Sequence, residues 1–429
     1  MNQHHENEAP TVPSRREALR SAAGLSAVAF GATLLAEPAL AAVDGFRLPA
    51  ATDEVTPFRL SVPAQALTDL KRRLAATRWP DRETVADSSQ GAPLAQMQAL
   101  VKHWRDAYDW RRIERQLNAW GQYRTRIDGL GIHFLHIRSP HKDALPLLLT
   151  HGWPGSVLEF RNVIGPLTDP TAHGGSAEDA FHLVIPSLPG FGFSDKPEAT
   201  GWNVPRIAKA WGVLMQRLGY TKWAAQGGDW GAGVTTALGH MKPPGLAGVH
   251  LSWPFVFPEK MPATLSAEEQ RAVDAVARFR SDGSGYLQQQ GTRPQTVAYG
   301  LADSPAGQAA WIYEKLQAWT DSDGDAEGLL GRDAILDNIT LYWLTDTAAS
   351  SARIYWENRG GGFSGGRLDL PVAASVFPHE IYRAPKSWAQ QSYPNLIHWN
   401  ELPRGGHFAA WEQPALFAQE MRDGLRTLR

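Results

Sequence analysis

The sequence predicts an α/β fold in which a doubly wound, mostly parallel sheet carries an inserted helical lid and follows a helical N-terminal extension. From residue 132 onward, short apolar runs that end in glycine or proline alternate with helix-like segments. This alternation stops between 254 and 370, where amphipathic helical spacing replaces it, and it resumes after 371. A chain of 429 residues is long enough to bury one large core and such a lid.

Residues 1–41 are typical of a signal peptide of the twin-arginine kind. Arg15 and Arg16 precede an alanine-rich apolar run over 22–36, and Ala39-Leu40-Ala41 supplies the small residues of a cleavage site. We therefore expect an exported protein, periplasmic or secreted, with no stable membrane span after cleavage. The alternative is a retained membrane anchor, but the run is short for a span, which needs about 20 apolar residues.

Residues 42–131 are expected to form a helical extension that packs on the core and lid as one folding unit. Apolar residues recur at helical spacing from Leu67 to Leu74 and again from Met97 to Trp104, and the segment 77–81 breaks the pattern between them.

The core is expected in two parts, 132–253 and 371–429, on either side of a lid over 254–370. The apolar runs predicted as strands are 132–136, 145–149, 183–185, 223–225, 372–376 and 396–399. Lid helices are expected near 268–280 and 308–319, and a closing helix over 414–428. Because ligands of such sheets gather at the carboxyl ends of the strands, functional residues should directly follow these runs.

The composition argues against several classes of function. Lysine and arginine number 42 against 44 aspartates and glutamates, which gives a net charge of -2 and no cationic field for a nucleic acid. The chain has no cysteine, so disulfides and thiolate chemistry are excluded. The mature sequence shows no metal-ligand spacing, and we expect neither a metal nor a cofactor.

The sharpest catalytic signal is Gly227-Gly228-Asp229-Trp230-Gly231, which follows a predicted strand and opens a predicted helix. Glycines at these flanks let strand and helix approach closely and expose the central side chain, as in a nucleophile elbow. A carboxylate at this position attacks a saturated carbon and forms an alkyl ester, which points to an epoxide or an alkyl halide as substrate. Alternatively, Asp229 could only cap the helix.

A second turn, His151-Gly152-Trp153-Pro154-Gly155, follows an early predicted strand. Its position suits an oxyanion hole, in which the backbone N–H groups of Trp153 and Trp230 would bind the oxygen of a tetrahedral ester intermediate. Taken alone, the segment could equally be a structural proline-glycine turn.

The remaining members of the expected site lie near the C-terminus. His407 follows two glycines after the last predicted strand, where a hydrolase of this topology carries its base, although a lone histidine is often structural. The acidic partner of that base should follow the penultimate strand, where Glu380 lies. Asp369 and Glu401 are the alternatives to Glu380.

These segments together resemble the microsomal-type epoxide hydrolases, enzymes of the α/β-hydrolase fold with a characteristic N-terminal extension. The resemblance covers about 55–428, and its further matching segments are Pro57-Phe58, residues 77–81, Tyr108-Asp109-Trp110-Arg111, Ile127-Asp128-Gly129-Leu130, residues 302–307, Ile354-Tyr355-Trp356-Glu357-Asn358 and Arg404-Gly405-Gly406-His407-Phe408.

The resemblance implies that Asp229 is the nucleophile, His407 the base that activates water and Glu380 its charge partner. It also implies that Tyr286 and Tyr355 of the lid donate protons to the epoxide oxygen, a role that suits phenols because ring opening creates an alkoxide. Three other lid tyrosines are expected only to pack: Tyr299, Tyr313 and Tyr342.

We therefore predict an epoxide hydrolase that converts small apolar epoxides and water into vicinal diols through an aspartyl ester. The sequence leaves a homodimer open. A haloalkane dehalogenase, which uses the same nucleophile, is the alternative enzyme, although a departing halide needs no proton donor. A non-catalytic protein that binds apolar ligands is the alternative from another functional class.

Overall fold

The computed structural model describes residues 46–361 and 366–429, all of which belong to one compact unit. The predicted signal peptide, residues 1–41, lies outside the described residues. Within the described ranges, no helix is both long enough and apolar enough to cross a membrane.

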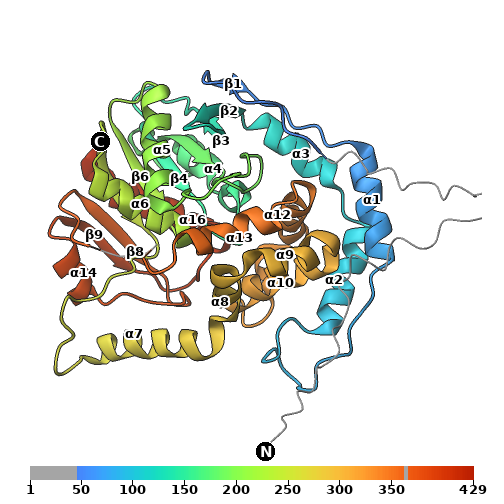
Figure 1. Cartoon of the computed structure of the whole chain (residues 1–429). Helices are drawn as coiled ribbons and strands as arrows, with labels where there is room; N and C mark the ends of the chain where they lie inside the picture. Colours follow the sequence, from blue (N-terminus) through green and yellow to red (C-terminus); the bar gives the residue numbers. More distant parts are fainter. Residues whose placement is uncertain (1–45, 362–365) are drawn as a thin grey trace, which may run out of the picture. The chain divides into compact units, whose positions relative to one another are not determined.

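A nine-stranded sheet forms the centre of this unit, in the order β1-β2-β3-β5-β4-β6-β7-β8-β9 (Figure 1). The strands from β5 through β4 to β9 run parallel, whereas the β1–β2, β2–β3 and β3–β5 pairs are antiparallel. Their bounds are β1 (Thr56–Pro57), β2 (Gln122–Ile127), β3 (Leu130–Ile137), β4 (Leu145–Thr150), β5 (Phe181–Pro186), β6 (Trp223–Gly227), β7 (Leu246–Leu251), β8 (Val372–Val376) and β9 (Leu396–Glu401).

The predicted α/β fold with a mostly parallel sheet is therefore confirmed. All six predicted apolar runs form strands of this sheet, namely β3, β4, β5, β6, β8 and β9. The central strands are continuous apolar runs because both of their faces are covered, and every residue of β6 and β8 is buried.

The N-terminal extension, expected to be helical, contains the strands β1 and β2 besides its helices. The apolar signal fails in β2 because several of its buried side chains are polar and find partners through the fold. Arg124 forms an ion pair with Asp195, and Gln122 donates to Asn118 over 3.0 Å. The sequence also did not predict strand β7.

Helices cover the sheet, as expected for a doubly wound fold. α5 and α6 contact each other, α6 lies against β4, β6 and β7, and α16 lies against β8, β9 and α4 (Figure 1). The helical segments of the core are η1 (Val157–Phe160), α4 (Ile164–Thr168), η2 (Pro170–His173), η3 (Ala177–Asp179), α5 (Val204–Arg217), α6 (Asp229–Met241), α14 (Lys386–Ser392), α15 (Ala409–Glu412), α16 (Pro414–Gly424) and η5 (Arg426–Leu428).

The lid lies between β7 and β8, and its helices pack mainly on one another. The segments are α7 (Ala267–Arg278), the π-helical turn η4 (Phe279–Gly283), α8 (Gly285–Thr292), α9 (Pro294–Asp303), α10 (Pro305–Trp319), α11 (Ala326–Leu330), α12 (Arg332–Leu344) and α13 (Ala348–Glu357). α13 contacts α8 and α9, while α12 contacts α10 and α11.

The N-terminal extension packs against this lid through three helices: α1 (Ala64–Ala75), α2 (Leu94–Asp106) and α3 (Trp110–Ala119). α1 and α2 contact each other and α10, and α3 contacts α12. α3 is strongly amphipathic, since Ile113 and Leu117 are completely buried while Gln116 is exposed. Its apolar face thus joins the hydrophobic core shared with the lid and sheet.

We predict that Ile113→Ala lowers the free energy of unfolding by about 2–5 kcal/mol, because it leaves a cavity in a completely buried site. The extension, lid and core should still unfold in one transition when followed by far-UV circular dichroism and tryptophan fluorescence. Gln116→Ala on the exposed face of the same helix is the control and should change stability by no more than about 0.5 kcal/mol. A separate early transition of the extension would contradict a single folding unit.

Candidate active site

Asp229 lies in a sharp turn between β6 and α6, as the sequence predicts. Its φ of +47° is left-handed, an uncommon conformation for a residue with a side chain. The flanking glycines make the turn possible, because a Cβ on Gly227 would overlap the carbonyl group of Gly231, and a Cβ on Gly231 would overlap that of Thr150. The side chain of Asp229 is thereby held at the carboxyl end of the sheet.

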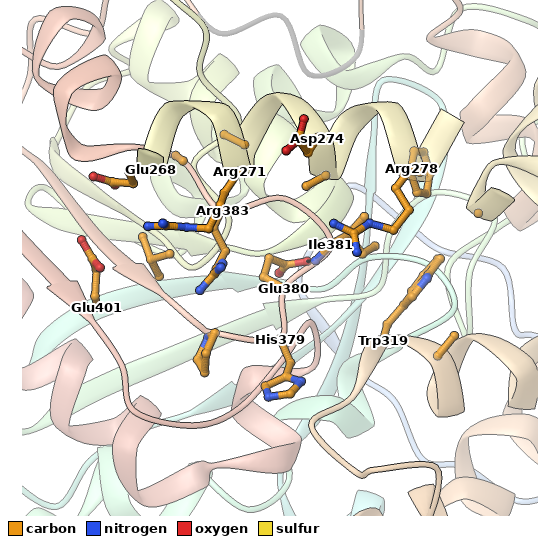
Figure 2. Close-up of a pocket in the computed structure, with 18 of the residues that line it drawn as sticks. Glu268, Arg271, Asp274, Arg278, Trp319, His379, Glu380, Ile381, Arg383 and Glu401 are labelled. Carbon is orange, nitrogen blue, oxygen red and sulfur yellow. Dashed lines mark hydrogen bonds between the residues drawn. The ribbon is translucent and has the colours of Figure 1, made fainter. Parts of the chain in front are cut away.

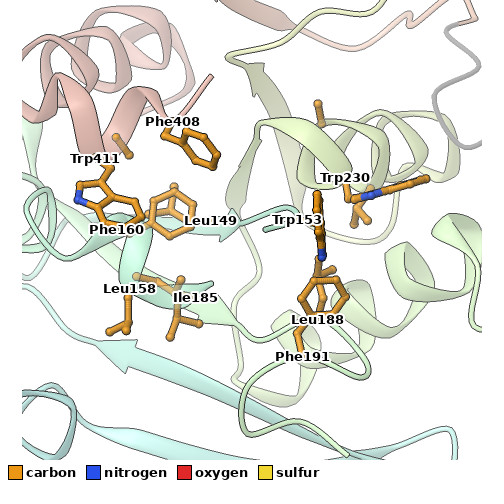
Figure 3. Close-up of a cluster of buried hydrophobic side chains, with 14 of the residues drawn as sticks. Leu149, Trp153, Leu158, Phe160, Ile185, Leu188, Phe191, Trp230, Phe408 and Trp411 are labelled. Atoms are coloured by element: carbon orange, nitrogen blue, oxygen red, sulfur yellow. The ribbon is translucent and has the colours of Figure 1, made fainter. Parts of the chain in front are cut away.

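The loop after β4, residues 151–155, is called here the β4 loop and approaches Asp229 directly. The backbone N–H of Trp153 donates to Oδ1 of Asp229 over 2.8 Å. The backbone N–H of Trp230 belongs to the first turn of α6, whose N–H groups point toward the helix N-terminus, where Asp229 lies. In Figure 3 the side chains of Trp153 and Trp230 belong to the apolar cluster beside the strand ends.

His151 fixes the peptide plane that presents the Trp153 amide. Its Nε2 accepts from the backbone N–H of Leu188 over 3.2 Å, so the hydrogen-bond network assigns the ring proton to Nδ1. Nδ1 lies 2.9 Å from the carbonyl oxygen of Gly152, to which it donates. Burial lowers the pKa of His151 to about 4, so the ring is neutral at pH 7 and keeps a single N–H.

His407 lies between two carboxylates. Its Nε2 is 3.2 Å from Oδ2 of Asp229, and its Nδ1 is 2.7 Å from Oε1 of Glu380. Asp369 and Glu401, the sequence-based alternatives to Glu380, bind other side chains instead. The structure thus brings together the three residues that the sequence singled out.

Backbone contacts position the His407 ring. Gly405 has a φ of +103°, which favours glycine, and the backbone N–H of His407 donates to the carbonyl oxygen of Trp319 over 2.9 Å. The buried carboxylate of Glu412 accepts from the N–H groups of Gly406 and Phe408 over 3.0 and 2.9 Å. The loop that carries His407 is therefore tied down on both sides of the histidine.

The surroundings of His407 favour its charged form. Burial alone would lower its pKa, but the negative charge of Glu380 and the contacts with Asp229 prevail and hold the pKa well above its usual range. Because the folded-state pKa exceeds the unfolded value of about 6.5, this imidazolium stabilises the fold below about pH 6.5. That stabilisation is lost as the pH rises through the folded-state pKa.

Tyr286 and Tyr355 come from lid helices α8 and α13 and meet over the β4 loop. Their ring centroids are 5.6 Å apart, and the Trp153 indole stacks on Tyr286 at 5.2 Å and meets Tyr355 edge-on at 5.8 Å. Burial raises the pKa of both phenols well above their usual range, reinforced by the negative charge of Asp229. Both are therefore neutral O–H groups at any working pH.

Two clefts approach this site and share Trp319, whose ring centroid is 5.0 Å from that of His407. The first, of about 510 Å³, lies between α7 and the segment after β8, with Glu380 on its wall and Arg271, Arg278 and Arg383 at its sides (Figure 2). The second, of about 940 Å³, is lined by Tyr286, by other lid residues and by residues 87–89 and 91 of the extension.

Sequence reasoning missed several residues around the site. Glu159 carries a carboxyl whose pKa burial raises to about 8, helped by the charges of Asp229, Glu412 and Glu380 and opposed by that of His407. Tyr342, expected only to pack, donates its hydroxyl to the carbonyl oxygen of Gly155 over 2.7 Å. The raised pKa of Glu159 depends on burial, and the Tyr342 hydrogen bond joins residues that are distant in the chain. Neither feature leaves a local sequence signal.

In the ranges that the structure describes, no three histidine or acidic side chains are placed to hold a metal ion. Around the carboxylate of Asp229 the structure places the imidazole of His407, two neutral phenols and backbone N–H groups.

Comparisons with known proteins agree with this geometry. Residues 55–160 match the family model described as epoxide hydrolase N terminus, and residues 146–304 match that of the alpha/beta hydrolase fold. A protein of Stigmatella aurantiaca assigned as an epoxide hydrolase is 69% identical over 87% of this chain and 86% of its own length. Epoxide hydrolase 1 of Sus scrofa is 35% identical over 88% and 90% of the two chains. The chain belongs to the epoxide hydrolase family.

A solved structure extends the family likeness to three dimensions. The crystal structure of the juvenile hormone epoxide hydrolase of Bombyx mori matches with a TM-score of 0.81 at 29% identity, covering 88% of this chain and 96% of that one. Family membership decides between the three functions that the sequence left open, in favour of the epoxide hydrolase over a dehalogenase or a binding protein. It also confirms a hydrolase of the α/β-hydrolase fold.

We predict that Glu380→Gln lowers the pKa of His407, because the substitution removes the largest charge that favours the imidazolium. Histidine-selective NMR titration should show the wild-type ring protonated well above pH 6.5 and the variant ring titrating at lower pH. Thermal unfolding of the variant should correspondingly lose part of the stabilisation present at low pH. An unchanged His407 titration would contradict the assigned ion pair.

Proposed function

We propose that this chain hydrolyses apolar epoxides to vicinal diols, with Asp229 as nucleophile, His407 as base, Glu380 as its charge partner, and Tyr286 and Tyr355 as proton donors. One observation carries the proposal: a buried carboxylate at an elbow lies against a backbone N–H and an imidazolium, beneath two neutral phenols. A carboxylate can open a strained ring only if the departing oxygen is stabilised, and the phenols provide that stabilisation.

In the first step, an oxygen of Asp229 bonds to a ring carbon while that carbon's bond to the epoxide oxygen breaks. The electron pair goes to the epoxide oxygen, where the hydroxyls of Tyr286 and Tyr355 stabilise the alkoxide. Ester formation cancels the charge of Asp229, which lowers the pKa of His407. The alkoxide takes its proton from one of these phenols and becomes a hydroxyl, and the proton that the imidazolium releases restores the phenol.

In the second step, neutral His407 takes a proton from water as the water oxygen attacks the ester carbonyl. The N–H groups of Trp153 and Trp230 bind the oxyanion of the tetrahedral intermediate. On collapse, the bond to the alkoxide oxygen breaks and the proton of the newly added hydroxyl passes to that oxygen, which releases the diol and restores the Asp229 carboxylate, with the imidazolium held between Asp229 and Glu380. The enzyme is thus returned to its resting charge state without any cofactor.

The second cleft suits an epoxide with an aromatic or bulky apolar substituent. Tyr286, Trp311 and Trp319 give the cleft aromatic walls beside its polar lining residues, and Phe279 and Trp153 adjoin Tyr286 at ring-centroid distances of 6.4 and 5.2 Å. Broad aromatic faces bind such substituents by apolar contact. A preference for small polar epoxides in a substrate panel would contradict this assignment.

Export through the twin-arginine route and a periplasmic or secreted location are likewise proposals. They rest on Arg15, Arg16 and the apolar run that follows them. Replacing both arginines by lysine should keep the protein in the cytoplasmic fraction of its host, and the mass of the exported protein should place cleavage after residue 41. Sedimentation analysis would test the homodimer that the sequence leaves open.

We predict that His407→Gln accumulates the alkyl-enzyme, because the nucleophile remains while the base for hydrolysis is lost. Intact-protein mass spectrometry after incubation with a styrene-oxide-like substrate should show the added mass of one substrate. Asp229→Asn is the control and should show no adduct. An unmodified His407→Gln protein, under conditions where the wild type turns over, would contradict the assigned roles.

Tyr286→Phe and Tyr355→Phe should each slow ester formation by about 10²-fold or more, because each removes a donor to the developing alkoxide. Rapid-quench measurement of the ester gives this rate constant directly. Tyr299→Phe is the matched control: this lid tyrosine is 72% exposed and should react as the wild type does. Wild-type ester formation in either active-site variant would remove that tyrosine from the mechanism.

A further inference from the structure

Two side chains of the lid helix α12 donate hydrogen bonds to two successive carbonyl groups of the β4 loop. The side-chain amide of Asn338 donates to the carbonyl oxygen of Pro154 over 2.7 Å. One turn further along the same helix, the Tyr342 hydroxyl donates to the carbonyl oxygen of Gly155 over 2.7 Å. Asn338 is completely buried and Tyr342 is 2% exposed, so neither bond competes with bulk water.

These two bonds act on the loop that presents the Trp153 amide to Asp229. His151 fixes the peptide between residues 152 and 153, the two bonds from α12 hold residues 154 and 155, and the next hydrogen bonds along the chain are those of Ser156 at the start of η1. An oxyanion donor is effective only when it is held in place before charge develops. Loss of the hydrogen bonds to the carbonyl groups of Pro154 and Gly155 would allow the Trp153 N–H to move away from Asp229.

Asp337, next to Asn338, connects the same helix turn to the N-terminal extension. Its completely buried carboxylate accepts from Arg112 of α3 over 2.7 and 2.8 Å and from the Tyr108 hydroxyl over 2.8 Å. It also accepts from Arg161, which follows η1 of the core, over 2.7 Å. The carboxylate therefore joins extension, lid and core at one point.

We propose that Asn338 and Tyr342 are positioning residues for hydrolysis of the aspartyl ester, and that the Asp337 cluster lets the N-terminal extension brace them. The inference rests on the proposed function. It gives the extension a catalytic consequence: Arg112 holds Asp337, Asp337 fixes the register of α12, and α12 holds the carbonyls of the β4 loop. No residue of the extension need touch the substrate for the extension to affect the rate.

The test separates the two chemical steps by single-turnover rapid quench with a styrene-oxide-like epoxide, quantifying the ester on the Asp229 peptide by mass spectrometry. Tyr342→Phe removes one hydroxyl and keeps the ring, and Asn338→Ser shortens the other donor. Both should slow ester hydrolysis by about tenfold or more, a loss expected when an oxyanion donor is misplaced, while ester formation changes much less. Ester should therefore accumulate in both variants.

Matched controls distinguish positioning from a general loss of packing. Tyr313→Phe removes the hydroxyl of another buried lid tyrosine, which binds Glu327 over 3.3 Å and not the β4 loop, so it should hydrolyse the ester as the wild type does. In the extension, Arg112→Gln should slow hydrolysis in the same direction as Tyr342→Phe. Arg115→Gln, an exposed neighbour on α3, should not.

Unchanged ester hydrolysis in both Tyr342→Phe and Asn338→Ser would overturn the positioning role, as would equal slowing in Tyr313→Phe. Hydrolysis in Arg112→Gln equal to that in Arg115→Gln would overturn the brace through the extension. If the wild type itself forms neither ester nor diol from the epoxide, the proposed function fails instead, and that outcome is seen before any variant is compared.

Discussion

The carboxylate of Asp229 is the feature on which the rest of this structure depends. It is nearly buried, it sits on a residue with left-handed backbone, and its two oxygens have different partners: a backbone N–H of the β4 loop and the imidazolium of His407. Bulk water cannot fully hydrate a carboxylate that is buried in this way, so the surrounding residues must stabilise its negative charge. That requirement explains why a second carboxylate, Glu380, lies behind His407 and keeps it charged.

The same arrangement makes the charge of the site depend on the state of the nucleophile. While Asp229 is ionised, the imidazolium is held by two negative neighbours. In the proposed mechanism, one of those neighbours is lost when Asp229 becomes an ester, so that His407 releases its proton and then serves as the base. The acid–base change therefore follows from the covalent step itself, and no conformational switch is required.

Much of the catalytic constellation could be predicted because its signals are local. Gly227 and Gly231 are required by close backbone approach, so the elbow is visible in five residues, and the chain order of elbow, acid and histidine placed Glu380 and His407. The residues that support the site could not be predicted in this way. Asn338 and Tyr342 bind a loop more than 180 positions away, and their helix shows only an ordinary apolar pattern. Likewise, β2 was missed because buried polar side chains such as Arg124 hide its strand character until their partners are known.

The most direct test of the whole account is a single turnover of a styrene-oxide-like epoxide in water enriched in heavy oxygen, with enzyme in excess and mass analysis of the Asp229 peptide. Attack of water on the ester carbonyl transfers solvent oxygen to the carboxylate, so the account predicts heavy oxygen in Asp229 and unlabelled oxygen at both positions of the diol. Heavy oxygen in the diol, with an unlabelled Asp229 peptide, would mean that water attacks the epoxide directly and would contradict the ester mechanism.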